Sequence, residues 1–146
     1  MEAALHQLNP KFRHLLTSLF LLLAVQVFAD TNCGEINSFE LTNGHETVSL
    51  MNNNSYILSD LPSGFYIKTN VSGNIKSVKY TVENLDTGKV YRITENITPY
   101  TFPAGNNAWH YGTGNFRITA KAFKYYLGIG ECDSKTIYFS FKPPCE

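Results

Sequence analysis

The sequence lacks the features that are typical of catalysis and of nucleic-acid binding. Its 146 residues carry 12 basic and 12 acidic side chains, a balance that does not favour a surface for phosphate backbones. It contains no Gly-x-Ser-x-Gly and no His-Glu-x-x-His motif. The glycine pairs at 112/114 and 128/130 lack the βαβ context of a nucleotide-binding loop and indicate turns. We therefore expect a protein that is not an enzyme, has no cofactor and binds no nucleic acid.

Cysteine and histidine are also scarce. The chain has three cysteines and, beyond residue 29, two histidines: Cys33, Cys132, Cys145, His45 and His110. The cysteine spacings do not suit a zinc site, and both histidines are expected in solvated turns or loops. Glu131 and Asp133 flank Cys132, but two carboxylates are too few for a dedicated calcium site. We therefore expect no metal site.

No apolar run has the length of about 20 residues that a membrane-spanning helix needs. The longest run covers 15–28, follows Lys11 and Arg13, and ends in Val27-Phe28-Ala29. A basic start, a short apolar stretch and small residues at its end are typical of a secretory signal peptide. We predict a signal peptide over 1–29, cleaved after Ala29; an uncleaved signal anchor is the alternative.

The mature chain, 30–146, has the length of one domain. We expect it to be secreted or held at the extracellular surface, with membrane contact only through the transient signal peptide. Its partner is then an extracellular protein or glycan that the sequence does not identify.

Strand-forming residues dominate the mature chain. Aromatic residues make up 14% of the sequence, and turn signals recur at about the 8–12-residue spacing of a sandwich or barrel. Strands are predicted over 36–42, 47–50, 56–58, 65–70, 75–83, 90–95, 100–102, 116–123 and 135–142, with turns at 71–74 and a loop at 128–130. The stretch 100–102 lies between two prolines, which places it at a sheet edge.

Regular alternation of apolar and polar residues predicts the core. The alternation is clearest in 75–83, 116–123 and 135–142, where every second residue is apolar. The predicted core residues are Phe39, Leu41, Val78, Tyr80, Val82, Phe116, Ile118, Ala120, Phe139 and Phe141.

Part of this pattern resembles a known family. Pro99-Tyr100, then Trp109, then a glycine before an alternating stretch from Phe116 to Ala122, resembles the second half of a bacterial-type immunoglobulin-like domain of secreted and cell-surface proteins. The stretches 77–80 and 36–41 resemble the third and first strands of that family. The resemblance covers roughly 36–142, and it implies an all-β, immunoglobulin-like β-sandwich of about seven to nine strands.

The chain departs from this family in two respects. Cys132 stands where the family usually has a loop rich in Gly and Thr, and the family domain is usually part of a larger protein. The resemblance therefore says more about the fold than about the function.

The resemblance also implies where the cysteines lie. In an immunoglobulin-like sandwich part of the first strand runs parallel to the last, so the two strands start at the same end. Cys33 precedes the first predicted strand and Cys132 precedes the last. Cys145 follows the far end of a strand that spans about 25 Å, whereas a disulfide tolerates about 7 Å between Cα atoms. We predict a Cys33–Cys132 disulfide, with Cys145 free or joining two chains.

Two surfaces are candidate binding sites. Trp109, His110 and Tyr111 lie in a loop rich in Gly and Asn, where exposed rings could stack on a sugar; the alternative, which the resemblance implies, is that Trp109 plugs the end of the sandwich. The second candidate is the outward face of 75–83, 116–123 and 135–142, a basic patch suited to an acidic polymer or partner; the alternative is a solvated face. Its residues would be Lys79, Thr81, Arg117, Thr119, Lys121, Thr136 and Tyr138.

Three Asn-x-Ser/Thr sequons begin at Asn53, Asn70 and Asn96, which is about what chance predicts for this composition. Asn53 and Asn70 are expected in turns, where they could carry glycans if the source glycosylates. The expected function is a secreted, non-catalytic module for protein binding or adhesion. A carbohydrate-binding module that uses the Trp109 loop is the alternative.

Overall fold

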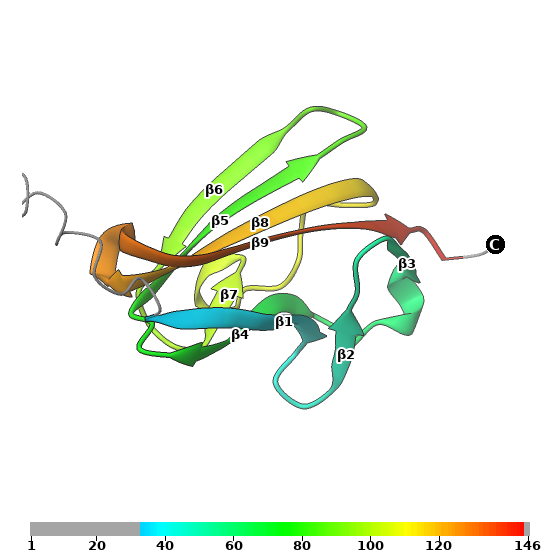
Figure 1. The fold of residues 1–146 in the computed structure, drawn as a ribbon. Helices are drawn as coiled ribbons and strands as arrows, with labels where there is room; N and C mark the ends of the chain where they lie inside the picture. The colour runs from blue at the N-terminus through cyan, green and yellow to red at the C-terminus, as the bar shows by residue number, and fades with distance from the viewer. Residues whose placement is uncertain (1–32, 145–146) are drawn as a thin grey trace, which may run out of the picture. The chain divides into compact units, whose positions relative to one another are not determined.

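A computed structural model describes residues 33–144, which form a β-sandwich of nine strands (Figure 1). The predicted signal peptide, its cleavage site after Ala29 and Cys145 lie outside the described residues. Within the described part, no helix combines the length and the apolar character needed to cross a membrane.

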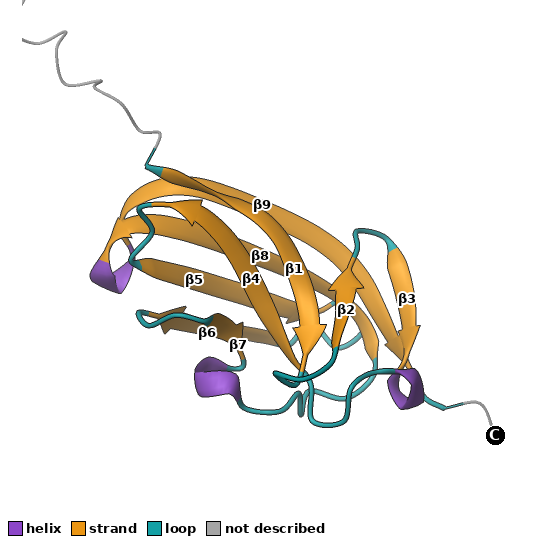
Figure 2. Cartoon of the chain, turned by 90° about the horizontal axis from the view of Figure 1, so that it is seen from below, coloured by secondary structure: helices purple, strands orange, loops and turns teal. Residues whose placement is uncertain are grey.

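Two sheets make up the sandwich (Figure 2). The four-stranded sheet has the order β2-β1-β4-β7, with β1 at Gly34–Thr42, β2 at Thr47–Leu50, β4 at Tyr66–Gly73 and β7 at Tyr100–Phe102. The five-stranded sheet has the order β3-β9-β8-β5-β6, with β3 at Asn54–Ile57, β5 at Ser77–Asn84, β6 at Val90–Glu95, β8 at Gly114–Tyr125 and β9 at Ile129–Lys142. Short 3-10 turns, η2 at Leu58–Asp60, η3 at Ala104–Asn106 and η4 at Tyr126–Gly128, lie between strands.

The predicted all-β class is confirmed, and the predicted strands correspond to the observed ones. Two boundaries were wrong. The turn expected at 71–74 belongs mostly to β4, because that strand pairs with β1 as far as Gly73 opposite Gly34. The loop expected at 128–130 is a tight turn at Leu127 and Gly128, so that β8 and β9 stay paired as far as Tyr125 and Ile129.

The core lies between the two sheets, and all ten residues predicted for it are buried. Alternate residues of β5, β8 and β9 meet Ile36, Ile67 and Phe102 of the opposite sheet. The buried Tyr80 hydroxyl donates to Thr69 Oγ1 at 2.6 Å, so its polar group is satisfied. Among the described residues, the buried core cluster runs from Ile36 to Phe141.

A β-bulge in β9 turns Cys132 toward the other sheet. In the β8–β9 register Ala122 pairs with Asp133 and Phe123 pairs with Glu131, so Cys132 is the extra residue. Cys132 forms a disulfide with Cys33, with 5.4 Å between the Cα atoms. The predicted pairing is confirmed.

The strand arrangement behind that prediction was only partly right, because β1 and β9 start at the same end of the sandwich but lie in different sheets. The strand that runs parallel to β9 is β3, whereas β1 pairs with β2 and β4 in the other sheet. Cys132 also lies within the last strand and does not precede it. The disulfide therefore joins the two sheets at one end of the sandwich.

Candidate functional site

The Trp109 loop closes the end of the sandwich that lies opposite the disulfide. The half-buried Trp109 ring lies about 5 Å from the ring centroids of Phe116 and Phe141 and is held by two hydrogen bonds. Its Nε1–H donates to the Gly112 carbonyl at 2.9 Å, and its backbone N–H donates to the Phe65 carbonyl at 2.7 Å. These contacts agree with the plug and do not favour a ring that stacks on a sugar.

Tyr111 and His110, the neighbours of Trp109 in the loop, differ in their burial. Tyr111 is half-buried, with its ring 4.3 Å from that of Tyr91 and 5.1 Å from that of Phe102. Burial and the nearby Tyr91 raise the pKa of Tyr111. His110 is exposed, as expected for a loop residue, and its ring lies 4.2 Å from that of Tyr111. The loop thus presents one imidazole to solvent, whereas its two larger rings pack on other aromatic residues.

The second candidate surface is assembled as predicted, because β5, β8 and β9 are neighbours. The cross-strand register places Lys79 opposite Lys121, Arg117 opposite Tyr138, and Thr119 opposite Thr136. The last two hydroxyls lie 2.8 Å apart. All seven predicted patch residues therefore share the outer face of the five-stranded sheet.

Much of the positive charge on this face is neutralised by carboxylates of the same face. Arg117 forms an ion pair with Glu83, and the Tyr138 hydroxyl and Glu83 both raise the pKa of Arg117. Lys121 Nζ lies 2.9 Å from a carboxylate oxygen of Glu131. Such exposed pairs contribute little to stability, but they leave the β8–β9 half of the face close to neutral.

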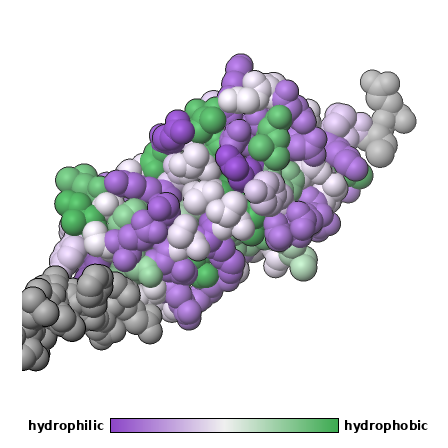
Figure 3. Space-filling view, turned by 45° about the horizontal axis from the view of Figure 1, so that its top comes forward, coloured by the Kyte–Doolittle hydropathy of each residue, from purple (hydrophilic) through white to green (hydrophobic). Residues whose placement is uncertain are grey.

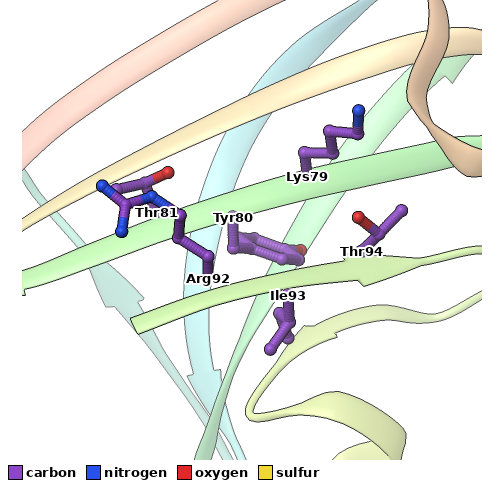
Figure 4. Close-up of a pocket in the computed structure, with 6 residues that line it drawn as sticks. All are labelled: Lys79, Tyr80, Thr81, Arg92, Ile93 and Thr94. Atoms are coloured by element: carbon purple, nitrogen blue, oxygen red, sulfur yellow. The ribbon is translucent and has the colours of Figure 1, made fainter. Parts of the chain in front are cut away.

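The uncompensated charge lies between β5 and β6, around a shallow hollow of about 340 Å³ (Figure 4). Lys79 and Thr81 of β5 line it opposite Thr94 and Arg92 of β6. None of the salt bridges between residues 33 and 144 involves Lys79 or Arg92. We call this feature the β5–β6 hollow; it holds two cations and two hydroxyls on an outer surface.

Arg92 and Thr94 were missed by sequence reasoning, although a signal was present. Asp86-Thr87-Gly88 has the composition of a hairpin loop, so the predicted strands 75–83 and 90–95 are expected to pair. Alternate residues of β6 must then share the outer face with Lys79. The observed register, with Thr81 opposite Arg92, follows from that hairpin.

The three sequons have different surroundings. Asn53 is exposed in a turn, as expected. Asn70 lies within β4 and donates from Nδ2 to Ser38 Oγ at 3.0 Å, so its placement in a turn was wrong. Asn96 follows β6, and its Oδ1 accepts a hydrogen bond from the Leu127 N–H at 2.7 Å. An attached glycan would have most room at Asn53.

The residues considered for metal binding have other partners. Glu131 pairs with Lys121, and Asp133 accepts a hydrogen bond from the Ile36 N–H. Among the residues that the structure describes, no group of three His, Cys, Asp or Glu side chains could hold a metal ion. The disulfide is compatible with an extracellular location.

No protein-family model matches this sequence, and no curated protein matches it.

Proposed function

We propose that this chain is a secreted, non-catalytic module that binds an extracellular protein or mediates adhesion, and that the β5–β6 hollow is its contact site. One observation carries the proposal. Lys79 and Arg92 line the same hollow without a carboxylate partner, the Lys79 Nζ lying 5.2 Å from the centroid of the Phe123 ring, whereas Arg117 and Lys121 on the same sheet are paired. The site is therefore complementary to an acidic segment of a partner.

The chemistry of the hollow suits a carboxylate. The Arg92 guanidinium has a planar fork of donors that can bind both oxygens of one carboxylate, and Lys79 adds a point charge. The hydroxyls of Thr81 and Thr94 lie opposite these cations in the strand register. Because both strands belong to a continuous sheet, the backbone of the site is ordered before a partner binds, which lowers the entropic cost of binding.

Three further points support the location and the class of the protein. The predicted signal peptide directs the chain to secretion, and a disulfide is typical of an oxidising compartment. The resemblance to bacterial-type immunoglobulin-like domains implies a module of secreted or surface proteins. None of the three identifies a partner.

Carbohydrate binding through the Trp109 loop is the second candidate function, and it has less support. A sugar-binding platform needs an exposed aromatic face, whereas the Trp109 ring packs against Phe65, Phe116 and Phe141. Of the three predicted binding residues of this loop, only His110 is exposed.

The test uses residues 30–146 immobilised and exposed to the surface-protein fraction of the source organism, with cross-linking to locate the contact. A Lys79→Gln/Arg92→Gln variant should lose the captured partner, and the wild-type complex should weaken with salt because exposed charges are screened. A Lys89→Gln/Lys142→Gln variant removes the same charge elsewhere and should bind normally. Equal capture by both variants would refute the site. A glycan-array signal that Trp109→Phe abolishes would favour the alternative function.

A further inference from the structure

We infer that the turn between β8 and β9 is a membrane-docking tip that contacts an anionic phospholipid surface. We define the tip as Ile97, Tyr125, Tyr126, Leu127 and Ile129. This contact goes beyond the expectation that only the signal peptide meets a membrane, and it adjoins the β5–β6 hollow at Lys79, whose side chain lies against Gly128 of the turn. It assigns a lipid partner to the folded domain itself.

The tip gathers much of the exposed apolar surface of the described chain. Five of its nine exposed large hydrophobic residues belong to the tip, with exposed fractions from 53% for Tyr125 to 77% for Ile97. Tyr125 and Ile129 face each other across the strands, and Asn96 binds the Leu127 N–H, which brings Ile97 to the turn. Figure 3 shows hydrophobic residues grouped at one end of the described domain. Clusters of exposed hydrophobic residues mark interaction sites, whereas single exposed hydrophobic residues are common on any protein surface.

The backbone conformation at Leu127 gives a second, independent observation. Leu127 has φ 61° and ψ 17°, and Gly128 follows with φ 72°. Consecutive left-handed residues in a hairpin turn favour Asn-Gly, and a bulky side chain is unusual there. The other non-glycine residues with positive φ in the described chain are both Asn. Turn stability therefore does not account for a leucine at this apex, whereas an apolar contact does.

The tip is also held in place before any contact. The buried Ser77 hydroxyl donates to the Tyr125 carbonyl at 2.6 Å and accepts from the Gly128 N–H at 3.0 Å. Together with the bond from Leu127 to Asn96, these hydrogen bonds fix both sides of the turn. The side chains of the turn are thus presented on an ordered backbone.

The charge around the tip selects the partner. Lys76 and Lys124 are exposed next to the tip, and the Lys79 side chain lies against Gly128. No salt bridge among residues 33–144 involves these three lysines. The nearby Glu131 is neutralised by Lys121. Lysines next to tyrosines and aliphatic side chains suit the headgroup region of an anionic membrane.

The test is co-sedimentation of residues 30–146, the predicted mature chain, with vesicles of phosphatidylcholine and phosphatidylglycerol, and with phosphatidylcholine alone. The wild type should bind the mixed vesicles, and less so at high salt. Leu127→Asn should weaken this binding about tenfold, because it removes one inserted side chain, while raising resistance to urea through its better turn residue. Lys76→Gln/Lys124→Gln should reduce the preference for phosphatidylglycerol.

Met51→Asn removes an apolar side chain that is 61% exposed at the opposite end and should bind as the wild type does. Absence of wild-type binding, or equal binding by Leu127→Asn, would overturn the inference. So would concentration-dependent dimerisation that Leu127→Asn abolishes, since the tip would then be a protein contact. Arg92→Gln alone, in the part of the hollow where Arg92 pairs with Thr81, should still bind vesicles, so the two proposals fail separately.

Discussion

Asp133 of β9 accepts a hydrogen bond from the backbone N–H of Ile36 on β1, with 2.7 Å between nitrogen and Oδ2. Lys135, two residues further along β9, donates to the carbonyl of Asn37 at 2.7 Å. Asn37 is the bulged residue of β1, since Ile36 pairs with Val71 and Ser38 pairs with Asn70. Two side chains of one sheet thus bind the backbone of the other sheet beside a bulge, close to the disulfide.

Replacing Asp133 should therefore weaken the junction of the sheets. Asp133→Ala leaves the Ile36 N–H without its acceptor, and we expect a loss of about 1–3 kcal/mol in the free energy of unfolding. Asp133→Asn keeps an acceptor oxygen and should lose less. Urea unfolding measures both, with Asp60→Ala in an exposed turn as the control, expected within about 0.5 kcal/mol of the wild type. Equal losses for Ala and Asn at 133 would contradict the assigned bond.

The disulfide should contribute more than any single hydrogen bond. It closes a loop with a sequence separation of 99 residues, so Cys33→Ser/Cys132→Ser should lower the free energy of unfolding by about 2–5 kcal/mol. Peptide mapping without reduction should recover Cys33 linked to Cys132. Cys145→Ser is the matched control and should leave stability unchanged; a Cys132–Cys145 peptide would disprove the pairing.

Replacement by alanine should lower the free energy of unfolding by very different amounts at two neighbouring residues of β9. Phe139 is 4% exposed and packs on Phe116, so Phe139→Ala should cost about 3–5 kcal/mol of the free energy of unfolding. Tyr138 is 43% exposed on the outer face, and Tyr138→Ala should cost less than about 1 kcal/mol. Urea denaturation of the two variants tests which side chain of β9 points into the core and which points to solvent. Similar losses in the free energy of unfolding would contradict the observed alternation.

Asp86 should make stability depend on pH. Side-chain and backbone hydrogen bonds from Asn115 hold the pKa of Asp86 below its ordinary value of 3.8. The pKa of Asp86 is lower in the folded chain than in the unfolded chain. The stabilisation that this carboxylate provides is therefore complete above its pKa in the unfolded chain, and it is lost as the pH falls through its pKa in the folded chain. Urea midpoints should fall between about pH 5 and about pH 2, and they should fall less in Asp86→Asn. Asp60→Asn should keep the wild-type pH profile.

Much of the fold could be predicted because it depends on local alternation. Every second residue of β5, β8 and β9 is apolar, and that pattern alone places Val78, Ile118 and Phe139 in the core. The bulge at Cys132 could not be predicted, because it is a property of strand pairing. Glycine misled the prediction at 71–74, where Gly73 continues a strand and does not end it.

The candidate sites were harder to predict because they also depend on how the strands pair. The outward positions of Lys79 and Arg117 followed from alternation. The net charge of the face that they form depends on which carboxylates lie opposite them on the neighbouring strands. Part of the tip was predicted as a loop, at 128–130, because of the glycine pair 128/130. Only the three-dimensional turn shows that Leu127 and Ile129 stay in solvent.

The disulfide also determines how the domain would carry mechanical load. β9 runs from the disulfide end of the sandwich to the opposite end, where the described chain leaves (Figure 1). A pulling force applied at Cys33 and Pro144 would pass through the sulfur bridge into β9 at Cys132 and then along that single strand. Residues 34–131 lie inside the covalently closed loop, so the domain could extend only by the short segment beyond Cys132 while most of the sandwich bore no tension.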